Sequence, residues 1–350
     1  MTPTRLTQYS HGAGCGCKIA PAVLETILHS DTIAASFPKL LVGNSSKDDA
    51  AVYNMGDGQA LISTTDFFTP IVDDARLFGR IASANAISDV YAMGGKPIMA
   101  IAILGWPVEK LPAELAQQVL EGARTACAEA GIPLAGGHSI DTPEPIFGLA
   151  VNGLVSIAHL KKNNTAKEGD LLFLTKPLGT GILSTAQKRE ALKDEHAALF
   201  FDQLGKLNSV GEALGKIEAV HAMTDVTGFG LLGHLIEMAE GSGVAAQLQY
   251  SSIPVIEGAK EYLAQRIVPD ATYRNWNSYS AKVGFAAGVN VMEAFSLLPD
   301  PQTNGGLLVA VAPEGADAVK EVFEKYGLGA HCTPIGSLQV AAEKTITVLS

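Results

Sequence analysis

Apolar runs of strand length alternate with longer segments of helical periodicity along the chain. ALISTTDFF (60–68) and IMAIAILGW (98–106) predict strands, and the segments 76–93 and 112–131 predict helices. A polar stretch at 159–170 interrupts this alternation, which then resumes with new strand and helix patterns. The sequence therefore predicts an α/β fold in two parts, divided near residue 157, as expected for a chain of 350 residues.

Acidic residues surround a predicted β-hairpin in DDAAVYNMGDGQALISTTDFF. Asp57-Gly58 favours a two-residue type I′ turn between antiparallel strands. With that turn, and without a β-bulge, the register places Asp49 opposite Asp66. Two facing carboxylates repel each other unless a cation or a solvated loop lies at that end. The alternative is that Asp48, Asp49 and Asp66 are solvated loop acids.

Further polar residues occur in segments that are otherwise apolar. Asn85 and Asp89 lie at positions i and i+4 of the helix predicted at 76–93, among alanine, isoleucine and valine. A buried carboxylate is costly unless it is hydrogen-bonded, paired or bound to a metal. Asp225 follows an apolar segment and precedes a glycine-spaced helix start, where capping the helix is the commonest role of an aspartate.

These acids together favour Mg²⁺ over zinc. Their oxygen ligands suit a hard cation, and the chain has no zinc-type set of histidines and cysteines. Glycine-rich segments at 134–141, 176–181 and 302–306 could approach phosphates, although none has the Walker pattern. The implied ligand is a nucleoside triphosphate.

Charge and hydropathy exclude several classes of partner. The net charge of −11 and the lack of a basic cluster argue against nucleic acid. The longest apolar stretch, 97–108, is too short to span a membrane, and the N-terminus has no signal-peptide core. Four cysteines in a chain of this length form no disulfide framework, so we expect a cytoplasmic protein with free thiols.

Two of these cysteines lie in the N-terminal segment HGAGCGCK. Cys15 and Cys17 supply too few ligands for a structural zinc site, even with His11. Lys18 favours the thiolate, and the interspersed glycines would let the segment close over a site and open again. A reactive thiol therefore fits better than zinc, while a disordered tail is the alternative.

The motifs, taken together, closely resemble those of bacterial selenophosphate synthetases (selenide, water dikinases) over almost the whole chain. They are HGAGCGCK, GNSSKDDAAVY, STTDFFTPIVDD, NAISDVYAMGGKP, LAGGHSID, MTDVTGFGLLGHL and DPQTNGGLL. The family is similar in fold to aminoimidazole ribonucleotide synthetase, a two-domain fold of the α+β type. The resemblance implies a catalytic N-terminal loop (1–20), an ATP- and Mg²⁺-binding domain that dimerises through its sheet (21–157) and a C-terminal α/β domain (158–350).

The resemblance also implies an activity and a set of site residues. The family converts ATP, selenide and water into selenophosphate, AMP and phosphate, which supplies selenium for selenocysteine and selenouridine. Matched by motif, the implied roles are as follows: catalysis by Cys15 and Lys18; Mg²⁺ binding by Asp49, Asp89 and Asp225; and ATP binding by Lys18, Ser46, Lys47, Asp48, Asp66, Asp89 and, from a dimer partner, Gly137, His138 and Ser139. The sequence departs from the family form QTSGG at Asn304.

Two other functions are consistent with parts of the pattern. Another ATP-dependent kinase or synthetase of the same fold would keep the acids but has no need of GCGCK. A non-enzymatic selenium or metal carrier would use the cysteines but not the acids. The resemblance leaves open a monovalent-cation requirement and a selenium-delivery protein as a further partner.

Overall fold

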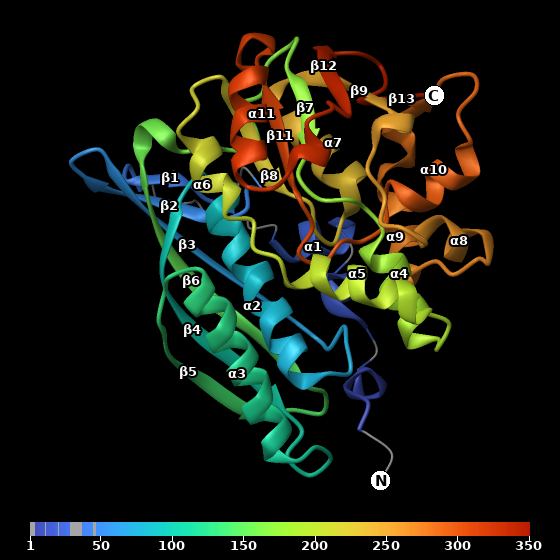
Figure 1. Ribbon diagram of the computed structural model, residues 1–350. Helices are drawn as coiled ribbons and strands as arrows, with labels where there is room; N and C mark the ends of the chain where they lie inside the picture. The colour runs from blue at the N-terminus through green and yellow to red at the C-terminus, as the bar shows by residue number, and fades with distance from the viewer. Residues whose placement is uncertain (1–3, 11, 20, 29–36, 45–46) are drawn as a thin grey trace.

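The computed structural model describes residues 4–10, 12–19, 21–28, 37–44 and 47–350. Its strands form two separate sheets that lie beside each other, the first in blue to green and the second mostly in orange to red (Figure 1). Helices alternate with the strands of both sheets along the chain, so the α/β class expected from the sequence is confirmed. None of the described helices combines the length and the apolar character needed to cross a membrane.

The first sheet is antiparallel except between its last two strands. The helices that the structure describes cover one of its faces and leave the other open (Figure 1). The strands, in spatial order, are β1 (Leu40–Val42), β2 (Ala51–Gly56), β3 (Gln59–Phe68), β6 (Ile146–Ser156), β4 (Lys96–Trp106) and β5 (Leu134–Asp141). The two strands predicted from apolar runs are β3 and β4, each within two residues of the expected bounds.

The β2–β3 hairpin turns where the sequence predicted. Asp57 and Gly58 both have positive φ, at 50° and 72°, as a type I′ turn requires. Beside the turn, however, the register shifts between Asn54 and Gly56, which leaves Met55 as an extra residue. The hairpin therefore contains a bulge.

This bulge makes the predicted pairing of two carboxylates wrong. Ala51 pairs with Ser63, and continuing that register aligns Asp49 with Thr65 rather than with Asp66. The two aspartates do not oppose each other across the hairpin.

The second sheet joins parallel and antiparallel strands from the remainder of the chain. It is antiparallel except at its β10–β13 and β13–β9 pairs. Its strands, in spatial order, are β10 (Val283–Phe285), β13 (Ile346–Leu349), β9 (Val244–Gln249), β12 (Gly336–Val340), β7 (Leu171–Leu174), β11 (Leu307–Val311) and β8 (Val220–Asp225).

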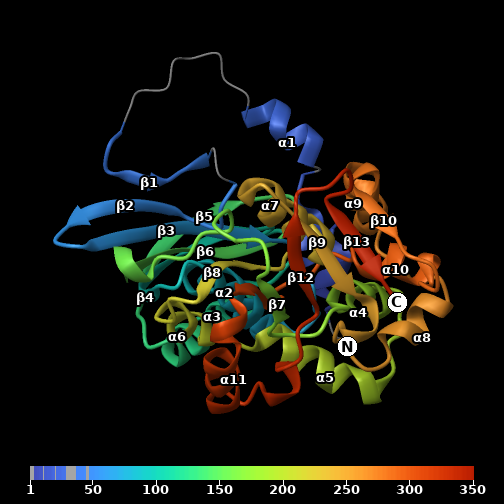
Figure 2. The same ribbon diagram turned by 90° about the horizontal axis from the view of Figure 1, so that it is seen from above.

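The α-helices divide between the two sheets, with α1 at the edge of the molecule, beyond α7, in the view from above (Figure 2). The bounds are α1 (Pro21–Leu28), α2 (Ala75–Ala92), α3 (Ala113–Glu129), α4 (Thr180–Lys188), α5 (Asp194–Gly205), α6 (Val210–Gly215), α7 (Gly230–Ser242), α8 (Ala259–Ala264), α9 (Asp270–Tyr279), α10 (Val291–Leu297) and α11 (Ala316–Lys325). The helices predicted at 76–93 and 112–131 are α2 and α3.

Helix α2 is the central element of the molecule. It packs on β3, β6 and α3 on one side and on β8, α5 and α6 on the other, which explains why it is apolar nearly all round. Its approach to α3 is close because a Cβ on Gly79 would lie 1.8 Å from the Val119 carbonyl oxygen. Asn85 and Asp89 are consequently held between the two sheets, where both are buried.

Candidate active site

A cleft of about 470 Å³ lies where the first sheet, α2 and the second sheet meet. Its wall is strongly acidic. Among the described residues, six carboxylates and two lysines line it, namely Asp48, Asp49, Asp66, Asp89, Asp225 and Glu237 with Lys18 and Lys47. An anionic ligand could bind here only together with cations.

Threonines of the neighbouring strands orient two of these acids. The Thr64 hydroxyl, on β3, donates to Asp89 on α2, and the Thr224 hydroxyl donates to Asp49 at 2.7 Å. Asp225 is the last residue of β8, five positions before α7 begins, and the residue that caps α7 is Phe229. The helix-capping role considered for Asp225 is therefore wrong, and its carboxylate is free to face the cleft.

Several carboxylate oxygens in the cleft are buried and have no hydrogen-bond partner among the described residues. They are Oδ2 of Asp48, Asp49 and Asp225. Burial raises the pKa of Asp48 and of Asp225 to about 6, and burial with repulsion from Asp225 raises the pKa of Asp49 and of Asp89 well above the usual range. The acids destabilise one another until positive charge is supplied.

Lys18 supplies a positive charge beside these acids. Its Nζ lies 3.7 Å from Oδ2 of Asp66, and its side chain is 38% exposed. Burial lowers the pKa of Lys18, but Asp66, Cys15 and Asp89 raise it by more, so the ammonium is charged. It therefore sits at the mouth of the cleft as a fixed positive group.

Cys15 lies beside Lys18 but behind the cleft wall. It belongs to the short 3₁₀ helix η2 (Gly14–Cys17), and its side chain is only 1% exposed. Its thiol donates to Oδ1 of Asn85 at 3.3 Å, and Nδ2 of Asn85 donates to Asp66. One amide thus connects the thiol to the acidic cleft.

Comparison with protein families and curated proteins decides which enzymes share this arrangement. Residues 47–155 match the AIR synthase related protein, N-terminal domain, and residues 167–348 match the corresponding C-terminal domain. The selenide, water dikinase of Colwellia psychrerythraea is 57% identical over the whole of both chains. That of Pseudomonas putida is 56% identical over 99% of each, and that of Escherichia coli K12 is 58% identical over 95% of this chain and 94% of its own.

The chain belongs to the selenide, water dikinase family. The resemblance carried by the sequence motifs is therefore confirmed, and with it the class of enzyme, a kinase.

Solved structures confirm the fold more widely. Hydrogenase maturation protein HypE in complex with ATP has a TM-score of 0.66 at 18% identity, covering 96% of this chain and 88% of that one. Thiamine-monophosphate kinase from Stenotrophomonas maltophilia has a TM-score of 0.64 at 20% identity, covering 89% and 91%. Identities this low show a shared two-domain fold and no more.

The segment matched to the dikinase motif LAGGHSID lies away from the cleft. Gly137, His138 and Ser139 are on β5, whose residues are almost all exposed, and none of the three lines the cleft of the same chain. Ser46 lies outside the described residues. Lys47 and Asp48 do line the cleft, with Asp48 also accepting from the Asn163 backbone N–H at 3.2 Å.

The sequence analysis missed two residues of the cleft that come from α7. His234 and Glu237 stand at positions i and i+3 and both face the cavity. Burial and the Lys18 charge lower the pKa of His234 to about 3, and its Nε2 accepts from the Thr227 N–H at 3.1 Å. Burial raises the pKa of Glu237 to about 7. The available indication was that His234 belongs to the motif MTDVTGFGLLGHL and that Glu237 follows two residues after the motif ends.

Asn304, the departure from the family form QTSGG, has a structural reason. Its φ is +49°, a left-handed conformation that asparagine tolerates better than most residues. Its side-chain amide donates to the carbonyls of Leu204 and Lys206, at 2.7 and 2.8 Å. Its backbone N–H donates to Asn85, so this loop supports the amide that holds the Cys15 thiol.

Proposed function

We infer that the chain is a selenophosphate synthetase, which converts selenide, ATP and water into selenophosphate, AMP and phosphate. The observation that carries this proposal is that the Asn85 amide contacts both the Cys15 thiol and an acid of the cleft. An acidic cleft with unpartnered carboxylate oxygens lies on one side of this amide, and a buried thiol beside a lysine lies on the other. A kinase without selenium chemistry would need only the cleft.

The carboxylates of the cleft fit Mg²⁺ bound together with ATP. Unpartnered, buried oxygens of Asp49 and Asp225, with Asp89 beside them, are hard ligands of the kind that Mg²⁺ prefers. Within the described part of the chain no three such side chains form a ready-made metal cage, so the phosphates would complete the coordination. Bound Mg²⁺ would neutralise the phosphate charge.

The two acids belong to different sheets, which makes this metal assignment testable. Asp49 precedes β2 and Asp225 ends β8. If both hold the same metal cluster, Asp49→Asn and Asp225→Asn will each weaken Mg-ATP binding, and the double variant will be far from additive. A titration of Mg²⁺ against bound nucleotide measures this. Additive losses would assign the acids to separate sites.

Lys18 would neutralise the phosphoryl group and the selenium nucleophile at the same time. Its ammonium lies between Asp66 in the cleft and the η2 segment that carries the thiol. Two anions that approach each other need such a charge, because the site otherwise contains mostly carboxylates. Lys47 lies in the same cleft and would contact ATP with Asp48 and Asp66.

Cys15 would hold or deliver selenium, because a thiolate is a soft nucleophile that suits a soft element. Cys127 and Cys332 are the other cysteines whose thiols the structure describes. Burial raises the pKa of Cys127 to about 11, so that thiol is inert. Free thiols of this kind suit the reducing cytoplasm, where we place the protein.

The uncovered face of the first sheet would form a homodimer. Cross-strand pairing aligns Thr65, Ala150 and Ile101 on this face, and Ile101 is 41% exposed. His138 pairs with Ile103 and belongs to the same face. Because Thr65 also lines the cleft, a second copy stacked here would bring its Gly137–Ser139 segment towards the ATP site.

Phosphorus NMR tests the proposed function directly. Incubating the protein anaerobically with Mg-ATP and selenide should give selenophosphate, AMP and phosphate in equal amounts. Without selenide, no selenophosphate should form. Formation of ADP without AMP, at the same rate with and without selenide, would contradict the proposal and indicate another kinase of this fold.

A further inference from the structure

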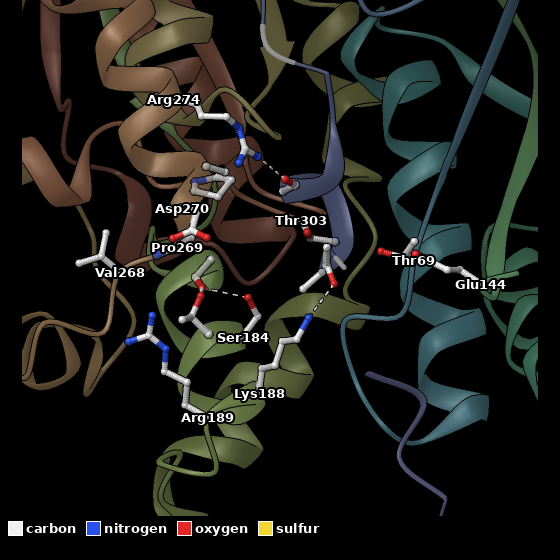
Figure 3. A pocket seen from close by; sticks show the side chains of 17 residues that line it. Thr69, Glu144, Ser184, Lys188, Arg189, Val268, Pro269, Asp270, Arg274 and Thr303 are labelled. Carbon is white, nitrogen blue, oxygen red and sulfur yellow. Dashed lines mark hydrogen bonds between the residues drawn. The ribbon is translucent and has the colours of Figure 1, made fainter. Parts of the chain in front are cut away.

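A second cavity, of about 530 Å³, borders the segment that carries Cys15 (Figure 3). Gly12, Ala13 and Gly16 form one wall of it, and no described residue lines both this cavity and the acidic cleft. Thr303 forms another part of the wall, and its hydroxyl accepts the Cys15 backbone N–H at 3.0 Å. The cavity therefore borders the same chain segment whose Lys18 lines the acidic cleft.

The charge of the second cavity differs from that of the cleft. Among the described residues, three basic side chains and two acidic ones line it, whereas acids outnumber lysines six to two in the cleft. Lys188 and Arg189 extend from the end of α4, and Arg274 extends from α9 across the cavity (Figure 3). The hydroxyls of Ser184 and Thr185 add neutral polar groups.

Two of these cations hold the catalytic segment by its carbonyls. Nζ of Lys188 donates to the carbonyls of Ser10 and Gly12, at 3.0 and 3.3 Å, and Nη2 of Arg274 donates to that of Gly16 at 3.0 Å. An anion in the cavity would compete with the carbonyls for these donors. Its binding would therefore loosen the segment on which Cys15 lies.

Arg189, unlike Lys188 and Arg274, donates no side-chain hydrogen bond to the described carbonyls of the catalytic segment. It is exposed, and its guanidinium makes no hydrogen bond or ion pair with any residue that the structure describes, although it lines the cavity. A cation at the end of a helix also complements the helix dipole. That role alone would affect stability and leave ligand binding unchanged, so the two roles can be separated by experiment.

We propose that this cavity admits the anionic selenium substrate, the hydrogen selenide ion, which Arg189 and its two basic neighbours attract to the Cys15 side of the catalytic segment. The proposal rests on the proposed function. In the cleft, both the carboxylates and the bound nucleotide repel a second anion, so a separate entrance lined by cations avoids that repulsion. ATP and selenide would then reach the Cys15 segment through two different cavities.

Steady-state kinetics of Arg189 variants test this entrance. We expect Arg189→Gln to raise the KM for selenide about tenfold, and Arg189→Glu to raise it further, while the KM for ATP stays within about twofold. Arg124→Gln is the matched control, because Arg124 is an exposed arginine on α3 and outside both cavities. It should leave both KM values unchanged.

The outcomes separate the entrance from the enzymatic activity. Suppose that the wild-type protein makes selenophosphate and that Arg189→Glu keeps the wild-type KM for selenide. The proposed selenide entrance is then wrong, whereas the proposed enzymatic activity is supported. The same conclusion follows if both KM values rise equally, or if only the melting temperature changes. If the wild-type protein makes no selenophosphate, both proposals fail.

Discussion

At the scale of single residues, Asn85 determines how the thiol and the cleft are connected. Its Oδ1 accepts from the Cys15 thiol and from the Asn304 N–H, whereas its Nδ2 donates to Asp66. Only one orientation of the amide satisfies all three groups, because the NH₂ group cannot accept. The buried amide thus fixes the thiol close to Lys18 and the acids.

The charge and the shape of Lys18 should both matter. We expect Lys18→Arg to lose most turnover, because a wide, planar guanidinium cannot replace a compact ammonium 3.7 Å from Asp66. Lys18→Gln should lose all detectable turnover and should also slow alkylation of Cys15 at neutral pH. Turnover and alkylation rates measure these effects. Wild-type turnover in Lys18→Gln would contradict the role.

The repulsion among the acids should be visible as a pH-dependent stability. The folded-state pKa of Asp225 is about 6, above the ordinary 3.8, so protonation of this carboxyl stabilises the folded state. This stabilisation is complete below pH 4 and is lost as the pH rises through 6. In EDTA at pH 7.5, Asp225→Asn should therefore melt about 2–4 °C above the wild type. The difference should vanish near pH 4. A variant that is less stable at both pH values would contradict the electrostatic account.

At the scale of elements, the sequence predicted those helices, strands and turns whose formation depends on residues close together in the chain. The hairpin turn, β3, β4, α2 and α3 follow from turn chemistry and periodicity. The bulge at Met55 escaped prediction because it depends on how β3 pairs with β6 as well as on the turn. The contribution of α7 to the cleft also depends on tertiary packing, as does the second cavity.

The catalytic segment should be sensitive to one glycine and tolerant at another. Gly14 has φ +51°, and a Cβ there would lie 2.4 Å from Thr303 Oγ1 and 2.7 Å from Ile71 Cδ1. We expect Gly14→Ala to cost about 1–3 kcal/mol of unfolding free energy and to reduce turnover. Denaturant unfolding measures the cost.

Gly16→Ala is the matched control for this prediction. The nearest atom to a Cβ at Gly16, Cγ of Pro301, is at the ordinary distance of 3.8 Å, and φ there is not positive. Its unfolding free energy should change by less than about 0.5 kcal/mol. Equal costs in the two variants would show that the segment is not held in the conformation described.

At the scale of the whole molecule, the cleft exists only because two sheets are packed against α2. Asp66 comes from the first sheet and Asp225 from the second, and α2 carries Asp89 between them. The family motifs predicted which acids these are, but the distance between them in sequence conceals how close they lie. The site is therefore a property of the assembled chain.

Disruption of the uncovered sheet face tests the homodimer. Ile101→Glu should convert a dimer into a monomer, because a charge at the centre of a packed apolar interface is costly. Sedimentation velocity should show the change while circular dichroism stays the same. Val108→Glu is the control, since Val108 is 63% exposed and follows β4. A wild-type protein that is monomeric at micromolar concentration would contradict the dimer.

The most direct test of the central claim separates nucleotide binding from selenium chemistry in a single variant. Cys15→Ser keeps a hydroxyl donor for Asn85, so the fold and the acidic cleft should be preserved. Phosphorus NMR with Mg-ATP and selenide should show no selenophosphate or AMP from Cys15→Ser, although it binds Mg-ATP like the wild type. Cys332→Ser, at a partly exposed thiol, should behave as wild type. Full selenophosphate formation by Cys15→Ser would contradict the account.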